Sequence, residues 1–415
     1  MTQSLTHTKD LRTGRSVWQG RSLPAIAQRP LTKDAKADVL IIGAGISGAL
    51  IADAVSDAGI TVLIADRRGP LLGSTPASTA LLQYDIDVPL CRLVKQIGTV
   101  RAERIWQRSS LALSALRERQ RHLGIQADAI NRDSLYLEGT ELDGNGLLLE
   151  ADARRRAGFE VTFLDQRTMK TRFGITRRAG LLSYDQLAVD PRRLAGGFLR
   201  AALSRRTQIV APVEVTDLAT TEGGVIATTK QGPSIHVRHL VFASGYEFPK
   251  CVPQKGHAIN STWAIATKSQ PRALWPERCF VWEASNPYLY VRVGPDNRII
   301  CGGEDEDFSD EDARDALLDK KAAILERKLS RLFPRLDPQA EFKWCGSFGT
   351  SKTGTPSIGP LLRLKHCYAA IGYGGNGITF PMLAAQILRG MITGVGDSDT
   401  DLFSFTKAFD RPAVG

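Results

Sequence analysis

A glycine-rich turn between apolar segments constrains the fold of this chain more than any other feature. Residues 39–42 form a continuous apolar run, as expected of a parallel strand buried on both faces. Gly43, Gly45 and Gly48 follow in the pattern GxGxxG, and apolar residues then recur at helical spacing. Such glycines permit a tight turn, close approach of the backbone to a pyrophosphate, and close packing of helix on strand. The free N–H groups of the helix N-terminus favour phosphate, so the segment predicts a dinucleotide site in a parallel α/β domain.

A second apolar run, residues 61–65, ends at Asp66. A carboxylate at the tip of the second strand, about 20 residues after the glycine turn, is suited to hydrogen bonding with a ribose. Arg67 and Arg68 follow and would suit a 2′-phosphate, but Asp66 would repel that group. NADP is therefore a minor option.

Two later segments favour a flavin over a nicotinamide. Residues 239–243 read as a buried strand that continues into Ser244 and Gly245. Residues 367–371 read as another strand, followed by a glycine-rich turn over 372–377 and a helix over about 380–391. Such a turn offers N–H groups and a helix N-terminus to an electron-rich group. Reduced flavin is anionic at N1 and O2, so we expect FAD as the cofactor.

Further segments share their order and spacing with one known family; they are residues 73–78, 189–191, 255–257, 300–303 and 344–359. From about residue 37 onward the chain resembles the FAD-dependent oxidoreductases of the D-amino-acid oxidase type, which include glycine oxidase, sarcosine oxidase and γ-glutamylputrescine oxidase. The resemblance implies hydride transfer from a C–H next to nitrogen of a small amine or amino acid to flavin N5. Oxygen or another acceptor would then reoxidise the flavin.

The resemblance also implies the fold class, which is α/β combined with α+β. A Rossmann-like FAD-binding domain would carry an inserted substrate domain built on an antiparallel sheet. We expect a basic N-terminal arm over 1–36, either poorly ordered or wrapped over the surface. An amphipathic pattern over 102–123 predicts a long helix in the substrate domain. The expected FAD-binding domain is discontinuous, over 37–92, 160–248 and 336–415, and the substrate domain comes from 93–159 and 249–335.

The glycine turns, the acid at the second strand and the family segments together predict the cofactor contacts. Cys345 lies near the region where some relatives attach flavin covalently, although a buried thiol is the simpler interpretation. The predicted FAD-binding residues are Gly43, Gly45, Ile46, Ser47, Gly48, Asp66, Arg67, Ser74, Ser78, Val213, Ala243, Gly245, Gly346, Gly374, Gly375, Asn376, Gly377, Ile378 and Thr379.

Hydride transfer to a flavin needs positioning and electrostatics rather than a protein nucleophile, and the sequence contains no GxSxG elbow. Lys255 is a candidate cation facing the flavin or an anionic substrate group, and His257 a candidate proton acceptor. Tyr84, Tyr288 and Tyr290 are candidates for the substrate pocket. Each also has a purely structural interpretation, as a turn lysine, a satisfied histidine or a core tyrosine. Neighbouring or weaker pocket candidates are Gln83, Asp85, Trp263 and Trp282.

One departure from the family pattern bears on the substrate. Amino-acid-oxidising members commonly carry an Arg shortly after the Trp-x-Gly that corresponds to residues 344–346, where it binds the substrate carboxylate. Here residues 347–351 read Ser-Phe-Gly-Thr-Ser. A bidentate clamp is therefore missing at that position, which favours amines without an adjacent carboxylate, or a clamp supplied elsewhere.

The net charge of +10 raises the question of a polyanionic partner. Residues 1–36 carry seven basic and two acidic side chains, and residues 151–208 carry thirteen and five. Neither segment interleaves aromatics at a regular spacing, so we interpret both as solvated surface and expect a small-molecule substrate rather than a nucleic-acid partner. The sequence does not specify an oligomeric state.

Scattered cysteines without CxxC spacing, and no secretory apolar run in the first 36 residues, predict a reducing, cytoplasmic location and no metal centre. No apolar stretch is long enough to predict a transmembrane segment. Two alternatives stay open at this point. One is FAD-dependent oxidation of a 2-hydroxy acid or a polyol phosphate, and the other is a flavin-containing component of RNA modification.

Overall fold

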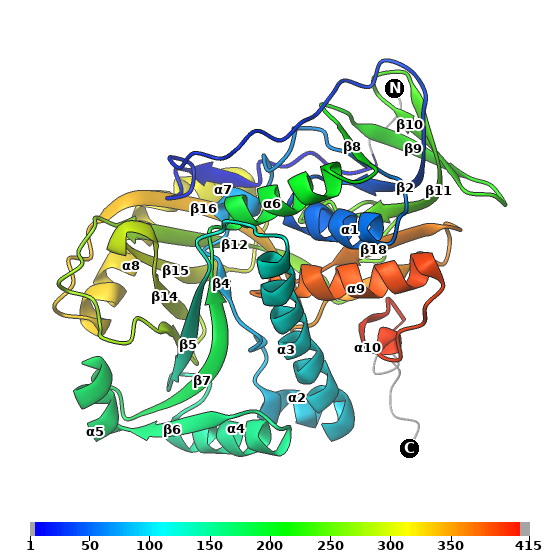
Figure 1. The fold of residues 1–415 in the computed structure, drawn as a ribbon. Helices are drawn as coiled ribbons and strands as arrows, with labels where there is room; N and C mark the ends of the chain where they lie inside the picture. The colour runs from blue at the N-terminus through cyan, green and yellow to red at the C-terminus, as the bar shows by residue number, and fades with distance from the viewer. Residues whose placement is uncertain (1–4, 407–415) are drawn as a thin grey trace.

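The computed structural model of the chain describes residues 5–406, which form two β-sheets with helices around them (Figure 1). The first sheet has the order β17-β18-β11-β2-β3-β8, and β10 and β9 continue from β11. Strands β8, β3, β2, β11 and β18 run parallel, whereas β17 is antiparallel to β18. The strands of this sheet are β2 (Ala35–Ile42), β3 (Val62–Ala65), β8 (Thr207–Val210), β9 (Val215–Thr220), β10 (Val225–Thr229), β11 (Ser234–Phe242), β17 (Ser357–Pro360) and β18 (Cys367–Ile371).

Both faces of the parallel sheet are covered, which explains the unbroken apolar run in β2. Val39 and Ile41 are fully buried in the core beneath the helices α1 (Ile46–Asp57), α6 (Pro191–Leu203) and α9 (Thr379–Thr393). Leu40 is fully buried in a separate core on the other face, which β9 and β10 help to close. Successive side chains of a strand point to opposite faces, so a strand covered on both sides is apolar at every position.

The second sheet has ten strands in the order β1-β16-β12-β15-β14-β13-β5-β7-β4, with β6 paired to β7. All its pairs are antiparallel except β13 with β5. Its strands are β1 (Arg12–Gly14), β4 (Leu81–Leu82), β5 (Ile130–Leu137), β6 (Val161–Asp165), β7 (Ala179–Ala188), β12 (His257–Thr267), β13 (Phe280–Glu283), β14 (Leu289–Val293), β15 (Ile299–Glu306) and β16 (Ala340–Ser351). A parallel sheet with helices beside a largely antiparallel sheet is the predicted fold class.

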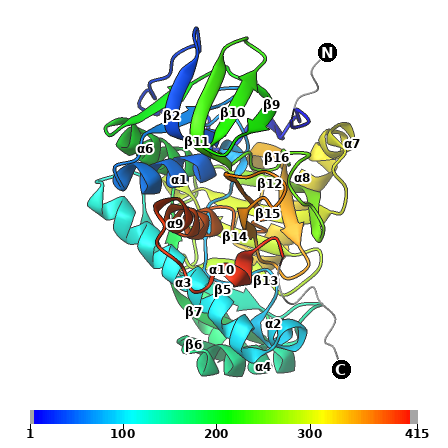
Figure 2. The ribbon, with the colours of Figure 1, turned by 90° about the vertical axis from the view of Figure 1, so that its right-hand side faces the viewer.

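Helix α8 (Leu318–Leu332) packs on β12, β15 and β16, and α3 (Thr99–His122) crosses beside α9 (Figure 2). Among residues 5–406, no helix combines the length and apolar character needed to cross a membrane. The remaining helical segments are α2 (Leu90–Ile97), α4 (Gly144–Arg156), α5 (Gln166–Thr168), α7 (Glu311–Ala316), α10 (Thr400–Phe403) and the short turns Thr75–Ala77, Met169–Phe173 and Pro295–Asn297.

The sheets divide the chain differently from the predicted domain boundaries. Strands β6 and β7 lie in the predicted FAD segment 160–248, and β16 lies in the predicted FAD segment 336–415, yet all three belong to the antiparallel sheet. These three strands therefore belong to a different sheet from the one that the predicted boundaries imply. The division of the chain into domains stays a prediction. The chain crosses between the sheets more often than a simple insertion requires.

The N-terminal arm wraps over the fold across its described part, residues 5–36, which is one of its two predicted states (Figure 1). Its strand β1 pairs with β16, with Arg12 opposite Gly346. Trp18 is almost fully buried and donates a hydrogen bond from Nε1 to the carbonyl of Ser78 at 2.7 Å. The arm therefore contributes to the core as well as to the surface. Residues 1–4 lie outside the described part.

Candidate active site

A cavity of about 550 Å³ extends from the carboxyl ends of the parallel strands to the face of the antiparallel sheet. This volume is typical of a ligand site, and carboxyl ends of parallel strands are where such folds bind ligands. We call the part beside Gly43, Asp66 and Val213 the glycine end. The opposite part is the aromatic end, lined by Asp87, Tyr246, Thr262, Tyr288, Tyr290 and Phe348.

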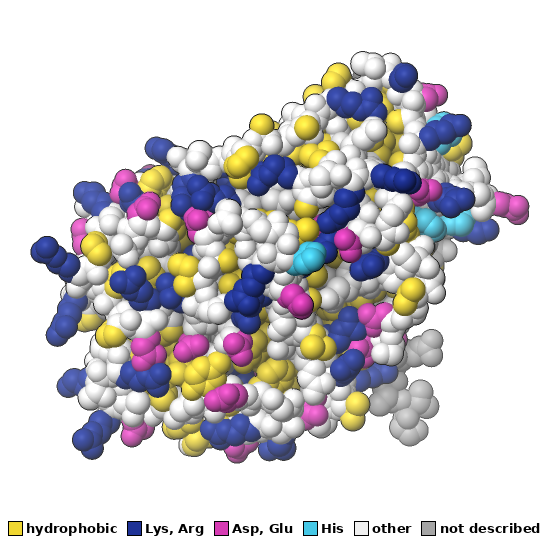
Figure 3. Space-filling model, in the orientation of Figure 1, with side chains coloured by type: hydrophobic (Ala, Val, Ile, Leu, Met, Phe, Trp, Pro, Cys, Tyr) yellow, Lys and Arg dark blue, Asp and Glu magenta, His cyan; other side chains and the backbone are white. Residues whose placement is uncertain are grey.

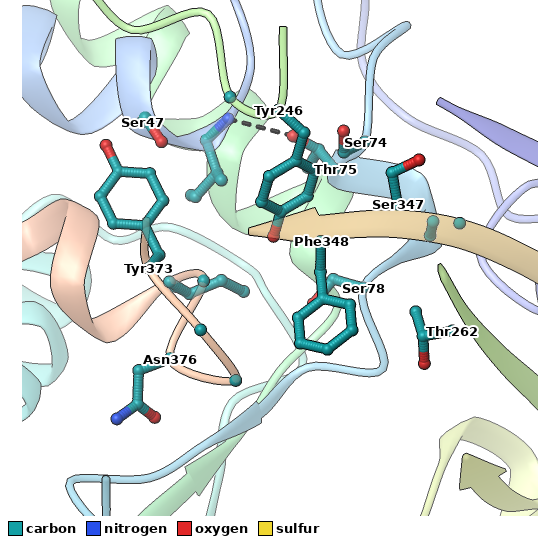
Figure 4. A pocket seen from close by; sticks show the side chains of 18 of the residues that line it. Ser47, Ser74, Thr75, Ser78, Tyr246, Thr262, Ser347, Phe348, Tyr373 and Asn376 are labelled. Carbon is teal, nitrogen blue, oxygen red and sulfur yellow. Dashed lines mark hydrogen bonds between the residues drawn. The ribbon is translucent and has the colours of Figure 1, made fainter. Parts of the chain in front are cut away.

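Two glycines make the turn at the glycine end possible. Gly43 has φ +115°, and a Cβ there would lie 2.4 Å from the carbonyl oxygen of Ala243. A Cβ on Gly48 would lie 1.9 Å from the carbonyl oxygen of Gly43. Helix α1 begins at Ile46, whose N–H donates to Thr75 Oγ1 at 3.0 Å (Figure 4). The tight cradle and the start of α1 suit the pyrophosphate of a dinucleotide.

Asp66 holds the backbone around this turn. Its carboxylate accepts hydrogen bonds from the N–H groups of Ala44 at 2.7 Å and Arg68 at 2.8 Å. The Arg68 guanidinium donates to both oxygens of Glu247, at 2.6 and 2.9 Å, and Arg67 lies 3.8 Å from the same carboxylate. Glu247 therefore compensates both arginines, which leaves little reason for a 2′-phosphate to bind here.

The N-terminal arm forms one wall of the glycine end through Leu5, Thr6 and Leu11. Backbone bonds fix this wall: Lys250 N–H donates to the Leu5 carbonyl at 3.0 Å, and Ser347 N–H donates to the Leu11 carbonyl at 3.1 Å. No motif in the arm indicates this role, because the contact depends on β1 pairing with β16. The sequence does not predict these residues, or Glu247, as part of the site.

The late glycine turn also faces the cavity, but the protein itself uses part of its hydrogen-bonding capacity. Gly375 N–H donates to Asp87 Oδ2 at 2.8 Å, and Gly374 N–H donates to a backbone carbonyl of β16 at 2.7 Å. The Asn376 amide donates to the Asp85 carbonyl at 2.9 Å. The expectation that these N–H groups are free for a flavin is therefore wrong for Gly374 and Gly375, since a neighbouring acid and carbonyl already accept their protons.

Tyr288 and Tyr290 lie on the cavity wall with ring centroids 5.7 Å apart. The glycines of β15 make room for them, because a Cβ on Gly302 would lie 2.3 Å from the Tyr290 hydroxyl. A Cβ on Gly303 would lie 2.0 Å from the Tyr288 carbonyl oxygen. Burial raises the pKa of both phenols above the ordinary value, so both stay protonated and able to donate.

Tyr246 and Phe348 approach the cavity from other elements (Figure 4), and a Cβ on Gly349, the residue after Phe348, would lie 3.4 Å from the Tyr246 ring. Burial, reinforced by the charge of Asp87, raises the pKa of Tyr246 to about 12. Tyr373 points its hydroxyl toward Ser47 at the start of α1 (Figure 4). Sequence reasoning missed Tyr246, Phe348 and Asp87 as site residues, because nothing local to each segment marks it as part of a pocket.

Two carboxyl groups at the aromatic end lack an ion-pair partner. Among the described residues, neither Asp87 nor Asp305 has a Lys or Arg within ion-pair distance. Desolvation raises the pKa of Asp87, and it raises that of Asp305 to about 6 although the hydroxyls of Thr262 and Tyr288 act in the opposite direction. Asp305 lies behind Tyr288 rather than on the wall itself, so negative charge backs the tyrosines.

Asp85 lines the cavity and is anchored from behind by a fully buried guanidinium. Arg154 forms an ion pair with Asp85 and also donates to Glu150 at 2.7 Å and Ser183 at 2.9 Å. Its guanidinium lies 4.7 Å from the Trp106 ring centroid. Helix α4 and the Asp85 loop are thus joined through one buried charge network, which fixes the loop that carries the cavity wall.

The structure brings most predicted cofactor residues together. All the predicted FAD-binding residues except Gly48 line the cavity, and Gly48 supports the turn from behind. Gln83, Asp85 and Trp282, three of the neighbouring or weaker pocket candidates, also line it, and Trp282 stacks on Tyr136 with ring centroids 3.9 Å apart. Trp263 does not line the cavity and is buried in the core under α8. Cys345 does not line the cavity either; its thiol lies against Asp315.

Three of the five candidate catalytic residues do not reach the cavity wall. Tyr84 is buried in the core, stacked on Phe159 with ring centroids 5.2 Å apart. Lys255 is exposed in the turn before β12. His257 Nε2 lies 2.8 Å from Ser357 Oγ, and the ring lies against Gly372 without lining the cavity. The structural interpretation fits all three residues. Tyr84 packs in the core, Lys255 faces solvent, and the His257 ring contacts the side chain of Ser357.

Comparisons with known proteins agree with this geometry. A family model described as DAO, FAD dependent oxidoreductase, matches residues 38–391. The probable oxidoreductase OrdL of Haemophilus influenzae is 23% identical over 401 residues, covering 93% of this chain and 88% of that protein.

Two solved structures are similar in fold. Glycine oxidase from Geobacillus kaustophilus superposes with a TM-score of 0.74 at 18% identity, covering 90% of this chain and 99% of that one. L-amino acid deaminase from Proteus vulgaris has a TM-score of 0.74 at 15% identity, covering 93% and 100%. Because the family model spans most of the sequence, the chain belongs to the DAO family of FAD-dependent oxidoreductases.

Proposed function

We propose that this FAD-dependent oxidoreductase oxidises a small amine or amino acid at a C–H bond next to nitrogen. The bound flavin supplies the hydride acceptor at N5. The observation that carries the proposal is one continuous cavity that joins a dinucleotide turn to an aromatic end. The wall there holds hydroxyls, aromatic rings and carboxylates, which suit binding and orientation of a polar, nitrogen-containing substrate.

At the glycine end, we assign the pyrophosphate to the turn over 43–48 and the start of α1, and a ribose to Asp66. Val213, Ala243 and Gly245 would flank the nucleotide. The support is steric and chemical: the turn tolerates no Cβ at Gly43, and Asp66 lies on the wall beside it.

At the aromatic end, we assign substrate contact to Tyr288 and Tyr290, with Tyr246 and Phe348 on the facing wall. Two neutral phenols next to an apolar ring exclude water and offer hydrogen bonds without a nucleophile. The turn over 374–379 would lie at the junction of cofactor and substrate, because it contacts Asp85 and Asp87 and starts α9.

The test is anaerobic bleaching of the flavin in the purified holoenzyme. Amines, amino acids, 2-hydroxy acids and polyol phosphates are added in turn, air is then admitted, and peroxide is assayed. We expect bleaching by nitrogen compounds only, and peroxide shows whether oxygen is the acceptor. Bleaching by hydroxy acids or polyol phosphates alone would overturn the proposal.

A matched pair of variants tests the assigned wall. Tyr290→Phe removes a hydroxyl at the cavity, and Tyr184→Phe removes one that bonds to Thr162 outside it. We expect flavin reduction to slow by about tenfold in Tyr290→Phe, as for loss of one buried hydrogen bond, and to be unchanged in Tyr184→Phe. Equal rates in both variants would exclude Tyr290 from the site.

A further inference from the structure

The cations near the aromatic end are engaged either by carboxylates or by backbone carbonyls. Arg292 is buried and does not line the cavity, and it donates to the carbonyls of Thr79, Ala80 and Val189. Arg92 is the only Lys or Arg among the described lining residues outside the glycine end, and it pairs with Glu141 at the rim. Behind the wall, Arg154 is shared between Asp85 and Glu150. On the part of this wall that the structure describes, a substrate carboxylate would therefore meet no Lys or Arg without a partner.

The negative charge at the aromatic end, in contrast, is not fully compensated by cations of the described residues. Asp87 is exposed on the cavity wall, and among the described residues it accepts a hydrogen bond from the Gly375 N–H at 2.8 Å. Asp305 stands behind Tyr288, and both of its oxygens are shielded from solvent without a hydrogen bond of ordinary geometry from the described residues. The carboxyl of Asp305 is buried without a cation, and that of Asp87 faces the cavity without one, so a cationic ligand in the cavity would offset negative charge on both.

The aromatic walls suit the same ligand. Tyr246, Tyr288 and Tyr290 line the same cavity as Asp87. The charge of Asp87 acts on Tyr246 and Tyr288, and the charge of Asp305 acts on Tyr288 and Tyr290. Aromatic rings attract ammonium groups, most strongly where water is excluded. Phe348 stands in the segment where an Arg would bind a carboxylate.

From this charge balance we propose that the substrate binds as an ammonium ion opposite Asp87 and carries no carboxylate on the carbon next to its nitrogen. The proposal rests on the proposed function and narrows it from amines and amino acids to amines. Asp87 is the specificity-determining residue, and Asp305 supports it through the tyrosine wall.

The experiment compares two matched probe pairs on the FAD-loaded enzyme under anaerobic conditions. Propylamine is paired with 2-aminobutyrate, which adds a carboxylate to the carbon bearing nitrogen, and dimethylamine is paired with N-methylglycine. Binding is followed by the perturbation of the flavin absorption bands. We expect each amine to bind at least tenfold more tightly than its carboxylated partner. Equal or tighter binding of the carboxylated partners, or no binding by any probe, would overturn the proposal.

Two isosteric variants assign the effect to Asp87. Asp87→Asn keeps an oxygen to accept the Gly375 N–H but removes the charge, and Asp312→Asn removes an exposed carboxylate outside the cavity. We expect propylamine to bind about tenfold more weakly to Asp87→Asn, with 2-aminobutyrate no weaker, and Asp312→Asn to match wild type. Equal loss for both probes would contradict the assignment.

The same data separate this proposal from the proposed function. If the amines bind selectively but no nitrogen compound bleaches the flavin, the oxidation chemistry fails and the charge preference stands. If amino acids bleach the flavin and outcompete the amines, the oxidation chemistry stands and the charge preference fails.

Discussion

Gly43 lies where β2 turns into α1, and its Cα faces the carbonyl of Ala243. Gly43→Ala would place a methyl group 2.4 Å from that oxygen in a backbone conformation that side chains rarely adopt. The turn must therefore shift away from the phosphate position. We expect the variant to fold but to lose FAD during gel filtration, measured as the ratio of flavin to protein absorbance.

Gly59 provides the matched control for this prediction. It also has a positive φ, +81°, but a Cβ there would meet nothing within 4 Å. Gly59→Ala should cost about 1–2 kcal/mol of stability from the backbone alone and keep its flavin. A Gly43→Ala protein that retains full flavin would contradict the role assigned to the turn.

Asp305 gives a prediction about stability and pH. Burial raises its folded-state pKa to about 6, above the ordinary value of 3.8, so the folded protein binds more protons than the unfolded chain between about pH 4 and pH 6. The stabilising contribution is present below pH 4 and is lost as pH rises through 6. Above pH 6 the ionised carboxylate costs roughly 3 kcal/mol.

Asp305→Asn removes this ionisation. We expect the variant to have a higher Tm than wild type at pH 7.5, and a smaller fall in Tm between pH 4.5 and pH 7.5. Thermal melts of both proteins across that range test the prediction. If the wild type and the variant lose the same amount of Tm over this interval, Asp305 does not titrate there.

At the scale of elements, the N-terminal arm joins the two sheets at the cofactor cavity. The matched family segment begins at residue 38, yet Leu5, Thr6 and Leu11 line the cavity ahead of it. The arm is fixed by strand pairing of β1 with β16, and by Lys9 N–H donating to Glu247 at 2.7 Å. An element outside the family segment thus closes the glycine end.

Leu11→Ala tests the arm, with Leu23→Ala as its control. Leu11 is buried at the cavity, whereas Leu23 is partly buried in the same arm and packs near α6. Removing apolar contact from the cavity wall should raise the dissociation constant of FAD by about tenfold in Leu11→Ala. Leu23→Ala should lower stability without changing that constant. Flavin fluorescence during dilution measures both, and equal FAD affinities would argue against the arm as a wall.

Sequence patterns predict the positions of helices and strands better than they predict which strands pair with each other. The amphipathic pattern over 102–123 corresponds to α3, and the pattern over 380–391 to α9. Strands β7 and β16, in contrast, lie in segments assigned to the FAD domain and pair in the antiparallel sheet. A helix is specified by contacts within its own segment. The pairing partner of a strand, in contrast, lies far away in the sequence, and the alternation of apolar and polar residues along one strand does not identify that partner.

Across the whole molecule, the same distinction separates the two ends of the cavity. At the glycine end, the turn over 43–48 and the strand tip at Asp66 are close in sequence, so local spacing predicts them, whereas the wall formed by the N-terminal arm is not predicted. The aromatic end takes Asp87, Tyr246, Tyr288 and Phe348 from four segments, and only the folded chain brings them together. Lys255 is predicted from its place in the family segment 255–257, and that position does not specify whether the side chain faces the cavity, which it does not line.

Many basic side chains of the molecule form ion pairs with acidic ones. The basic segments 1–36 and 151–208 meet acids from elsewhere: Arg21 and Arg193 share Asp128, and Arg205 pairs with Asp53. On the face shown in Figure 3, basic and acidic side chains are interspersed. A polyanion needs a continuous stripe of uncompensated cations, so the net charge of +10 overstates the attraction that this surface exerts.

We therefore expect no measurable binding of duplex DNA or of a stem-loop RNA at 150 mM salt, despite the net charge. Fluorescence anisotropy of a labelled oligonucleotide tests this, with a titration down to 20 mM salt as the internal control. Any binding at low salt should vanish as salt rises, because surface attraction without base contacts depends on counterion release. Submicromolar affinity that persists at 150 mM would require base or stacking contacts, and would favour the RNA-modification alternative over an enzyme whose principal polyanionic ligand is FAD.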